Sequence, residues 1–327
     1  MKQGTHVRVL VTGAAGFIGS HLAQRLLADG HEVLGLDSLI PTYDPRQRLA
    51  SLAVLDRMEG FTLRIDDLRT VNLSELLDGV DIVYHLAAIP GVRASWSQFA
   101  AYLEHNLLAL QRLLDGVRES KVRRVVWASS SSVYGETDRY PTREDDATHP
   151  HSPYGATKLA GEHLVGAYVR NHVLDVVGLR YFSVYGPRQR PDMGVHRLLE
   201  AALGYGSFEL YGDGSQVRDM TFVSDVVAAT IAASEASVPP GANLNIAGGC
   251  TVSLSELIEQ IESLVGGSIP MQFSTVQVGD VRKTGGDTTR ARELLAWEPQ
   301  VDLKSGLSQQ LEWHRRRREQ RWPETFA

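Results

Sequence analysis

The sequence predicts an α/β protein in which a doubly wound parallel sheet is joined to a smaller, mostly helical C-terminal lobe. Three observations lead to this fold class. Short β-rich runs alternate with helical stretches through the first half of the chain, the pattern of a parallel sheet covered by helices on both faces. The amino-acid composition changes past about residue 182, where Pro and Gly become frequent in YGPRQRPDMG. The 327 residues are enough for a large core and two lobes.

The expected strands of the first half are short runs rich in β-branched and other apolar residues. HVRVLVTG is followed by GSHLAQRLLADG and then by HEVLGLD, which indicates a strand, a helix and a second strand in succession. Strands are expected at 6–13, 31–37, 61–66, 80–88, 122–130 and 174–181. Helices are expected between them at 19–30, 99–120 and 154–172.

The change of composition past about residue 182 divides the chain into two parts. Residues 1–181 are expected to form a dinucleotide-binding domain, to which the chain returns around 217–246. Residues 182–327 are expected to form the second, substrate-binding lobe, with helices near 195–204, 225–236, 253–265 and 305–317. The basic run HRRRREQR at 314–321 is interpreted as the solvated end of the last helix.

Composition excludes several classes of protein. The formal net charge of −6 disfavours a nucleic-acid partner. Hydrophobic residues make up 43% of the chain, but no apolar run approaches the roughly 20 residues that span a bilayer, and we expect no membrane association. Cys250 is the one cysteine, which precludes an intrachain disulfide and fits a reducing, cytoplasmic location. No metal site is expected.

A glycine array lies between the first strand and the first helix. VTGAAGFIGSHL places Gly13, Gly16 and Gly19 where a tight turn needs residues without a Cβ. A pyrophosphate there would meet backbone N–H groups and the positive end of the helix dipole. Asp37 ends the next strand, where its carboxylate can accept hydrogen bonds from ribose hydroxyls and would repel a 2′-phosphate. The array therefore favours NAD over NADP.

A tyrosine and a lysine share one face of a predicted helix. SPYGATKLAGEHL places Tyr154 and Lys158 four residues apart, so both side chains can face one cavity. A phenol with a pKa of about 10 is a poor base at neutral pH, but a nearby ammonium and a positive nicotinamide ring would both favour the phenolate. A hydroxyl from the cluster Ser129 to Ser132 would hydrogen-bond the reacting oxygen.

These motifs resemble those of the extended short-chain dehydrogenase/reductase superfamily, whose cofactor domain is a Rossmann-type fold. The resemblance covers nearly the whole chain, through the glycine array, HLAA, SSSSVYG, SPYGATKLAGE, LRYFSVYGP and YGDGSQVRDMTFVSDV. It is nearest to nucleotide-sugar epimerases, decarboxylases and dehydratases, which hold NAD tightly and return it unchanged. The resemblance implies Tyr154, Lys158 and Ser130 as the catalytic residues. It implies cofactor contacts by Gly13, Gly16, Phe17, Ile18, Gly19, Asp37, Asp67, Leu68, Leu86, Ala87, Ala88, Asn106, Tyr154, Lys158 and Tyr181.

Two serines discriminate among the reactions of this superfamily. The resemblance implies a shared first step, in which the tyrosinate removes the proton of the sugar 4-OH as hydride passes from C4 to NAD. The 4,6-dehydratases carry an Asp-Glu pair before the Val-Tyr-Gly of this motif, and the UDP-glucuronate decarboxylases carry a Glu there. Here those positions are Ser131 and Ser132, which cannot supply carboxylate acid–base chemistry near neutral pH. Their hydroxyls argue against a lyase and favour 4-epimerisation.

The stretch YFSVYGPRQRPDM at 181–193 is similar to that of UDP-glucuronate 4-epimerases. By this resemblance Arg190 would pair with the sugar carboxylate, because a guanidinium matches a carboxylate bidentately. The alternative interpretation of Arg190 is a structural ion-pair partner. FELYGDG at 208–214 resembles the uridine-binding strand. The expected substrate contacts are Arg93, Ser131, Ser132, Ser183, Arg190, Tyr211, Arg218 and Arg282, with the last two Arg side chains near the diphosphate.

The chemistry of a uronic acid gives a reason for several side chains to bind the sugar carboxylate together. Oxidation of C4 makes a β-keto acid, which loses CO2 when the C5–C6 bond stands perpendicular to the carbonyl plane. Hydroxyls grouped around one Arg can hold the carboxylate away from that pose. The prediction is reversible conversion of UDP-glucuronate to UDP-galacturonate.

Three other functions stay open at this point. They are 4-epimerisation of UDP-glucose or its N-acetylated form, a lyase with an unusual acid, and a non-catalytic module that only senses NAD. The resemblance also implies a homodimer that pairs through the helices at 99–115 and 154–170.

Overall fold

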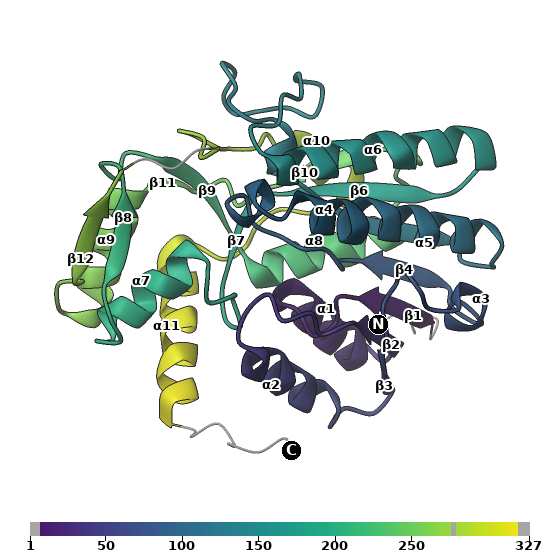
Figure 1. The fold of residues 1–327 in the computed structure, drawn as a ribbon, viewed down its shortest axis with the longest axis horizontal. Coiled ribbons are helices and arrows are strands. Elements are labelled where there is room, and N and C mark those ends of the chain that lie inside the picture. The colour runs from purple at the N-terminus through teal and green to yellow at the C-terminus, as the bar shows by residue number, and fades with distance from the viewer. Residues whose placement is uncertain (1–6, 276–278, 320–327) are drawn as a thin grey trace.

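The computed structural model describes residues 7–275 and 279–319 (Figure 1). Its centre is a seven-stranded sheet in the order β10-β6-β5-β4-β1-β2-β3, in which every neighbouring pair is parallel. The strands are β1 (Arg8–Thr12), β2 (Glu32–Asp37), β3 (Phe61–Ile65), β4 (Ile82–His85), β5 (Arg124–Ser130), β6 (Val176–Tyr181) and β10 (Asn243–Ile246). The prediction of a doubly wound α/β fold is confirmed.

Helices cover both faces of this sheet. They are α1 (Phe17–Ala28), α2 (Pro45–Leu55), α3 (Leu73–Leu76), α4 (Phe99–Tyr102), α5 (Ala109–Arg118), α6 (Pro153–His172) and α8 (Val223–Glu235). Side chains alternate across each strand, so Val9 and Val11 of β1 pack with α1, α2 and α8, whereas Leu10 packs with α3, α5 and α6. The predicted helix at 99–120 is a run of α4, a π-helical segment (Leu103–Leu108) and α5.

The second lobe contains more strand than the sequence patterns indicate. β7 (Ser183–Tyr185), β9 (Val217–Phe222) and β11 (Thr251–Ser253) form one small sheet, and β8 (Phe208–Tyr211) pairs in parallel with β12 (Met271–Ser274). Its helices are α7 (Gly194–Ala202), α9 (Leu254–Val265), α10 (Thr289–Leu295) and α11 (Leu303–Glu319). The chain returns to the large sheet through α8 and β10, whereas β9 stays in the small sheet of this lobe.

The loop that follows β7 connects the two lobes. The carbonyl oxygen of Pro187 accepts a hydrogen bond from Nε2 of His21 on α1 at 2.8 Å, and Arg188 Nη1 donates to Ser20 on the same helix at 3.4 Å. Gln47 on α2 donates to the carbonyl oxygens of Arg188 and Gln189 at 2.7 and 2.8 Å. Burial, with the nearby Arg188, lowers the pKa of His21 to about 4, so this contact is made by a neutral ring at neutral pH.

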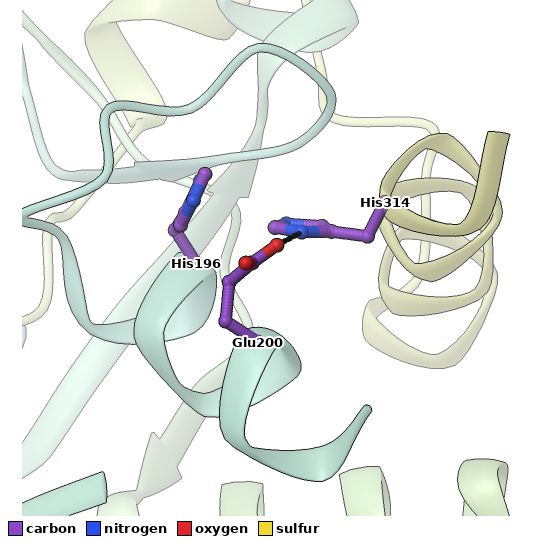
Figure 2. Close-up of side chains that lie close together, drawn as sticks. All are labelled: His196, Glu200 and His314. Carbon is purple, nitrogen blue, oxygen red and sulfur yellow. Dashed lines mark hydrogen bonds and ion pairs between the residues drawn. The ribbon is translucent and has the colours of Figure 1, made fainter. Parts of the chain in front are cut away.

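A buried cluster holds α11 against α7 (Figure 2). His196 and Glu200 lie one turn apart on α7, and His314 of α11 donates through Nδ1 to Glu200 Oε1 at 2.6 Å. His196 donates through Nδ1 to the Gln189 carbonyl at 2.8 Å, and the Arg317 guanidinium lies 3.5 Å from its Nε2. These residue types can bind metal ions, but the guanidinium already approaches the ring nitrogen that a cation would use. We interpret the cluster as a hydrogen-bonded helix contact, and the expected absence of a metal stays a prediction.

In the part of the chain that the structure describes, no helix is both long enough and apolar enough to cross a membrane.

Candidate active site

The glycine array forms a turn that only glycine fits. Gly13 has φ +74°, and a Cβ on it would lie 2.9 Å from the backbone nitrogen of Ala87. A Cβ on Gly19 would lie 2.1 Å from the carbonyl oxygen of Gly13. α1 begins directly after Gly16, and among the described residues no side chain caps its first turn. The first N–H groups of α1 are therefore available to a phosphate, so the cradle fits the pyrophosphate of a dinucleotide.

Asp37 lies at the carboxyl end of β2, beside this turn. Its Oδ2 accepts a hydrogen bond from the backbone nitrogen of Ala15 at 3.0 Å, and its Oδ1 accepts one from Leu39 at 2.9 Å. Each carboxylate oxygen has a further lone pair, so the side chain can accept from two ribose hydroxyls without losing either contact. The half-buried carboxylate is placed as the sequence predicts.

The segment after β4 is fixed from two sides. Thr12 Oγ1 accepts a hydrogen bond from the Ala87 nitrogen at 3.1 Å and shares a hydrogen bond with Nδ1 of His85 at 2.8 Å. Burial, helped by the charge of Lys158, lowers the pKa of His85 to about 3, so the ring is neutral. Asn106, on the π-helical segment, accepts from the Ile89 nitrogen at 2.8 Å and donates to its carbonyl at 3.0 Å. This is the supporting role expected of Asn106.

The other predicted cofactor residues lie in two environments. Gly16, Ile18, Leu86 and Ala88 are half-buried around the turn and the end of β4, and Phe17 and Leu68 are buried. Asp67 is paired with Arg69 at 2.7 Å, and hydrogen bonding to that guanidinium keeps its carboxyl pKa below the usual value. The Tyr181 hydroxyl lies 2.7 Å from Thr230 Oγ1 in the core, so this side chain is engaged away from the turn.

Tyr154 and Lys158 lie in the first two turns of α6, as their spacing predicts. The helix begins at Pro153, and Ser152 caps it by accepting from the Gly155 nitrogen at 3.1 Å. Lys158 Nζ is 6.0 Å from the centre of the Tyr154 ring and donates to the carbonyl oxygen of Ala128 on β5 at 2.8 Å. The pair is therefore held near the carboxyl end of β5.

The ionisation of both groups is shifted by burial. Burial raises the pKa of the Tyr154 phenol, whereas hydrogen bonding to Ser130 and the charge of Arg190 act to lower it. Burial lowers the pKa of the Lys158 ammonium to about 8, although the charge of Glu162 acts to raise it. A neutral phenol thus lies near an ammonium that is unusually easy to deprotonate.

The four consecutive serines separate into two environments. Ser129 donates to Glu162 Oε1 at 2.6 Å inside the fold, because successive side chains of a strand point to opposite faces. Ser130 accepts from the Ser132 nitrogen at 3.1 Å and donates to its hydroxyl at 3.1 Å. Ser131 and Ser132 are half-buried in the short 3₁₀ turn (Ser131–Val133) that follows β5. Ser130 is thereby placed beside the phenol, and Ser129 is structural.

Arg190 lies in the loop after β7, near Tyr154. Its charge acts on Tyr154 and also on Tyr102, whose ring packs edge-on against that of Tyr154 with centroids 6.2 Å apart. Its guanidinium is bound by Asp192, with Nε to Oδ1 at 3.0 Å and Nη2 to Oδ2 at 2.8 Å. Both interpretations of Arg190 are thus compatible with the structure: it forms an ion pair with Asp192, and its charge acts on Tyr154.

The remaining predicted substrate residues form two groups, and Arg93 is the one among them that comes from the first domain. Arg93 stacks over the Tyr211 ring, with Cζ 4.0 Å from its centre, although 118 residues separate them. Arg218 donates to Asp280 at 2.7 Å and to the carbonyl oxygen of Arg282 at 3.4 Å. The exposed Arg282 and the half-buried Ser183 on β7 are also part of the second lobe.

Sequence reasoning missed three features of the site. Tyr102 packs on Tyr154, and Asp192 binds Arg190. Glu162 pairs with Arg180 at 2.7 Å, both side chains being only 6% exposed, and it also accepts the hydrogen bond from Ser129. The spacing of Glu162, four residues after Lys158 on the same helix face, was a signal that could have found it.

Three comparisons place this geometry among known proteins. The model of the NAD dependent epimerase/dehydratase family matches residues 9–247. The chain belongs to this family. YtcB of Bacillus subtilis, named an uncharacterized UDP-glucose epimerase, is 42% identical over 93% of this chain and 97% of its own. A UDP-glucuronate 4-epimerase of Thermodesulfobacterium geofontis is 35% identical over 93% of this chain and 95% of its own.

A solved member of the family is similar over the whole fold. The UDP-glucuronic acid 4-epimerase of Bacillus cereus, in complex with UDP-glucuronic acid and NAD, has a TM-score of 0.92 and 39% identity. The similarity covers 95% of this chain and 99% of that one. An NAD-dependent epimerase of the extended short-chain dehydrogenase/reductase type, expected from the motifs, is therefore confirmed.

Proposed function

We propose that this epimerase interconverts UDP-glucuronate and UDP-galacturonate through a 4-keto intermediate, using tightly bound NAD. One observation carries the choice of substrate. The guanidinium of Arg190 lies close enough to Tyr154 for its charge to act on the phenol, and the groups beside Ser130 are the hydroxyls of Ser131 and Ser132. A cation among neutral hydroxyls suits a sugar carboxylate. The B. cereus relative that binds UDP-glucuronic acid supports the same choice.

Each catalytic side chain has a distinct task in this reaction. Tyr154 removes the proton from the sugar 4-OH and later returns it to the C4 oxygen, after the keto-sugar has turned over in the pocket. Ser130 hydrogen-bonds the reacting oxygen, and Lys158 supplies positive charge close to the phenol. The glycine cradle and Asp37 would hold NAD, whose chemistry is the reversible acceptance of a hydride from the sugar C4. Because burial opposes the phenolate, Tyr154 depends on this surrounding positive charge to act as a base.

The same hydroxyls explain why an epimerase can avoid losing CO2. The 4-keto uronate is a β-keto acid, and it decarboxylates when the C5–C6 bond overlaps the carbonyl π system. Arg190 would hold the carboxylate, with Ser131, Ser132 and Ser183 as further donors. Because positions 131 and 132 are serines, this motif lacks the carboxylate acid–base group that a decarboxylase or dehydratase would require.

The alternative is 4-epimerisation of a neutral UDP-hexose. It is favoured by the similarity to the B. subtilis relative, which is named a UDP-glucose epimerase, and by the ion pair between Arg190 and Asp192, which leaves Arg190 with a partner even when no uronate is bound. Replacing Arg190 by alanine separates the two possibilities. The variant should lose turnover of UDP-glucuronate, whereas a neutral-sugar epimerase would retain turnover of its preferred substrate.

Proton NMR of the purified protein with UDP-glucuronate tests the proposal directly. We expect UDP-galacturonate signals to grow toward an equilibrium mixture without UDP-pentose. The Tyr154→Phe variant should abolish turnover while retaining NAD. Pentose products would restore the lyase interpretation, and turnover of UDP-glucose alone would support the alternative.

We also propose a homodimer formed through the helical run at 99–118 and α6. The support is an apolar surface there, on which Phe99, Leu103 and Leu108 are 42%, 38% and 48% exposed. Light scattering should give twice the monomer mass, and Leu103→Glu should reduce it. A cytoplasmic location stays a prediction, which fractionation of the cells would test.

A further inference from the structure

The ion pair at Arg190 uses only one edge of the guanidinium. Asp192 accepts from Nε and Nη2, the side-on edge of the planar group. Among the described residues, the hydrogen bonds of Arg190 involve no donor on Nη1. The end-on edge, made by Nη1 and Nη2, is therefore available to a second carboxylate in the same plane.

The backbone fixes the pair before any ligand arrives. The Met193 nitrogen donates to the carbonyl oxygen of Arg190 at 3.1 Å, which closes a tight turn over residues 190–193. Pro191 occupies the second position of this turn, where its ring presets φ. The Asp192 side chain is thereby returned toward Arg190 within two residues.

The two partners differ in their exposure. The Arg190 side chain is 18% exposed, and that of Asp192 is 56% exposed. Asp192 thus approaches Arg190 from the solvent side, whereas the charge of Arg190 is felt by Tyr102 and Tyr154 inside the site. An arginine that is free to rotate would lose side-chain entropy on binding a ligand, and this pair has already incurred that loss.

We propose that Asp192 is a positioning residue that fixes the plane of the Arg190 guanidinium and, through it, the rotation of a sugar carboxylate about C5–C6. This inference rests on the proposed function. Its consequence concerns the fate of the 4-keto uronate. A carboxylate held in the plane that Asp192 sets keeps the C5–C6 bond away from the perpendicular pose.

A loosened guanidinium would permit a balanced side reaction. The C5–C6 bond breaks, CO2 leaves, and the bonding electron pair forms the enolate of the C4 ketone. A solvent proton then adds at C5, which gives a 4-keto pentose without any change in the oxidation state of the cofactor. The ratio of pentose to hexuronate products therefore reports the orientation of the carboxylate, and protein stability alone would not move it.

The experiment compares Asp192→Asn and Asp192→Glu with the wild type in the NMR assay with UDP-glucuronate. Asp192→Asn should raise KM several-fold, change kcat less, and increase the pentose fraction at least five-fold. Asp192→Glu, which keeps the charge and can still reach the guanidinium, should restore most of the wild-type ratio. The matched control is Asp78→Asn, an exposed aspartate near the amino end of β4, at the opposite edge of the sheet from the site.

Three outcomes would overturn the inference. A lower KM in Asp192→Asn would show that Asp192 competes with the substrate for Arg190. An unchanged KM and product ratio would show that Asp192 serves only the start of α7. Wild-type protein that does not turn over UDP-glucuronate would overturn the proposed function as well. The wild-type reaction therefore distinguishes failure of the proposed function from failure of the positioning role of Asp192 alone.

Discussion

Replacing Lys158 with methionine is expected to stabilise the cofactor-free protein while abolishing its activity. The ammonium is 4% exposed, and burial lowers its pKa from 10.5 to about 8. A difference of about 2.5 pKa units corresponds to roughly 3 kcal/mol that the charged form costs the folded state at pH 7. The hydrogen bond to the carbonyl of Ala128, worth about 1 kcal/mol, opposes this gain. The net stabilisation of the variant should be about 2 kcal/mol at pH 7.

The pH dependence of this difference is the sharper test. The folded state releases the Lys158 proton near pH 8 and the unfolded state near 10.5, so the unfolded state binds more protons between these values. The free energy of unfolding of the wild type therefore rises with pH through this window relative to that of the variant. Between pH 7 and 9.5 the wild type should recover about 2 kcal/mol.

Urea unfolding of the two proteins without NAD, at pH 7 and at pH 9.5, measures this recovery. Lys121→Met, in an exposed loop before β5, is the control and should show no such change between the two pH values. A stability difference between wild type and Lys158→Met that is the same at both pH values, or that grows with pH, would refute the claim that burial of the ammonium is what costs stability.

Three further outcomes follow from contacts of the same site. Glu162→Gln should destabilise the protein by about 3–5 kcal/mol in urea, because it leaves Arg180 as an uncompensated buried charge, and adding Arg180→Met should restore much of the loss. Gly19→Ala should remove bound NAD, measured by release on denaturation, because its Cβ would meet the Gly13 oxygen at 2.1 Å. Burial raises the pKa of the Asp219 carboxyl to about 6, so the folded state holds this proton at pH values where the unfolded state has released it. The free energy of unfolding therefore falls as the pH rises through 6, and relative to Asp219→Asn the wild type should lose about 1 kcal/mol between pH 5 and 7.

The large sheet could be predicted because five of its strands, β1, β2, β4, β5 and β6, are largely buried on both faces and are therefore nearly continuous apolar runs. With the more exposed edge strand β3, six of the seven strands were placed within a few residues of their observed ends. β7, β11 and β12 contain three or four residues each, too few for a period-two pattern to be recognised. Their pairing depends on the surrounding tertiary structure, which a single sequence does not show.

The site could be predicted where its chemistry is local in the sequence. The glycine array and the pair Tyr154 and Lys158 depend on spacings of three and four residues, which a turn and a helix convert directly into proximity. Contacts between distant segments could not be obtained in this way. The separation of Ser129 from Ser130 needed the partner Glu162, 33 residues further along, before the role of each hydroxyl could be assigned.

A negatively charged substrate would change the electrostatic surroundings of the Tyr154 phenol. Arg190 helps to lower the pKa of the Tyr154 phenol, but its charge is already shared with Asp192. A uronate bound at the other edge of the guanidinium would neutralise it further, and its help to the phenolate would decrease when the substrate is in place. In the proposed reaction, an Arg190 side chain that holds the sugar carboxylate would therefore give less help to the Tyr154 phenolate. The positive charge that compensates must come from Lys158 and from the nicotinamide end of the cofactor, which is a physical reason for the ammonium to stay buried beside the phenol in spite of its cost.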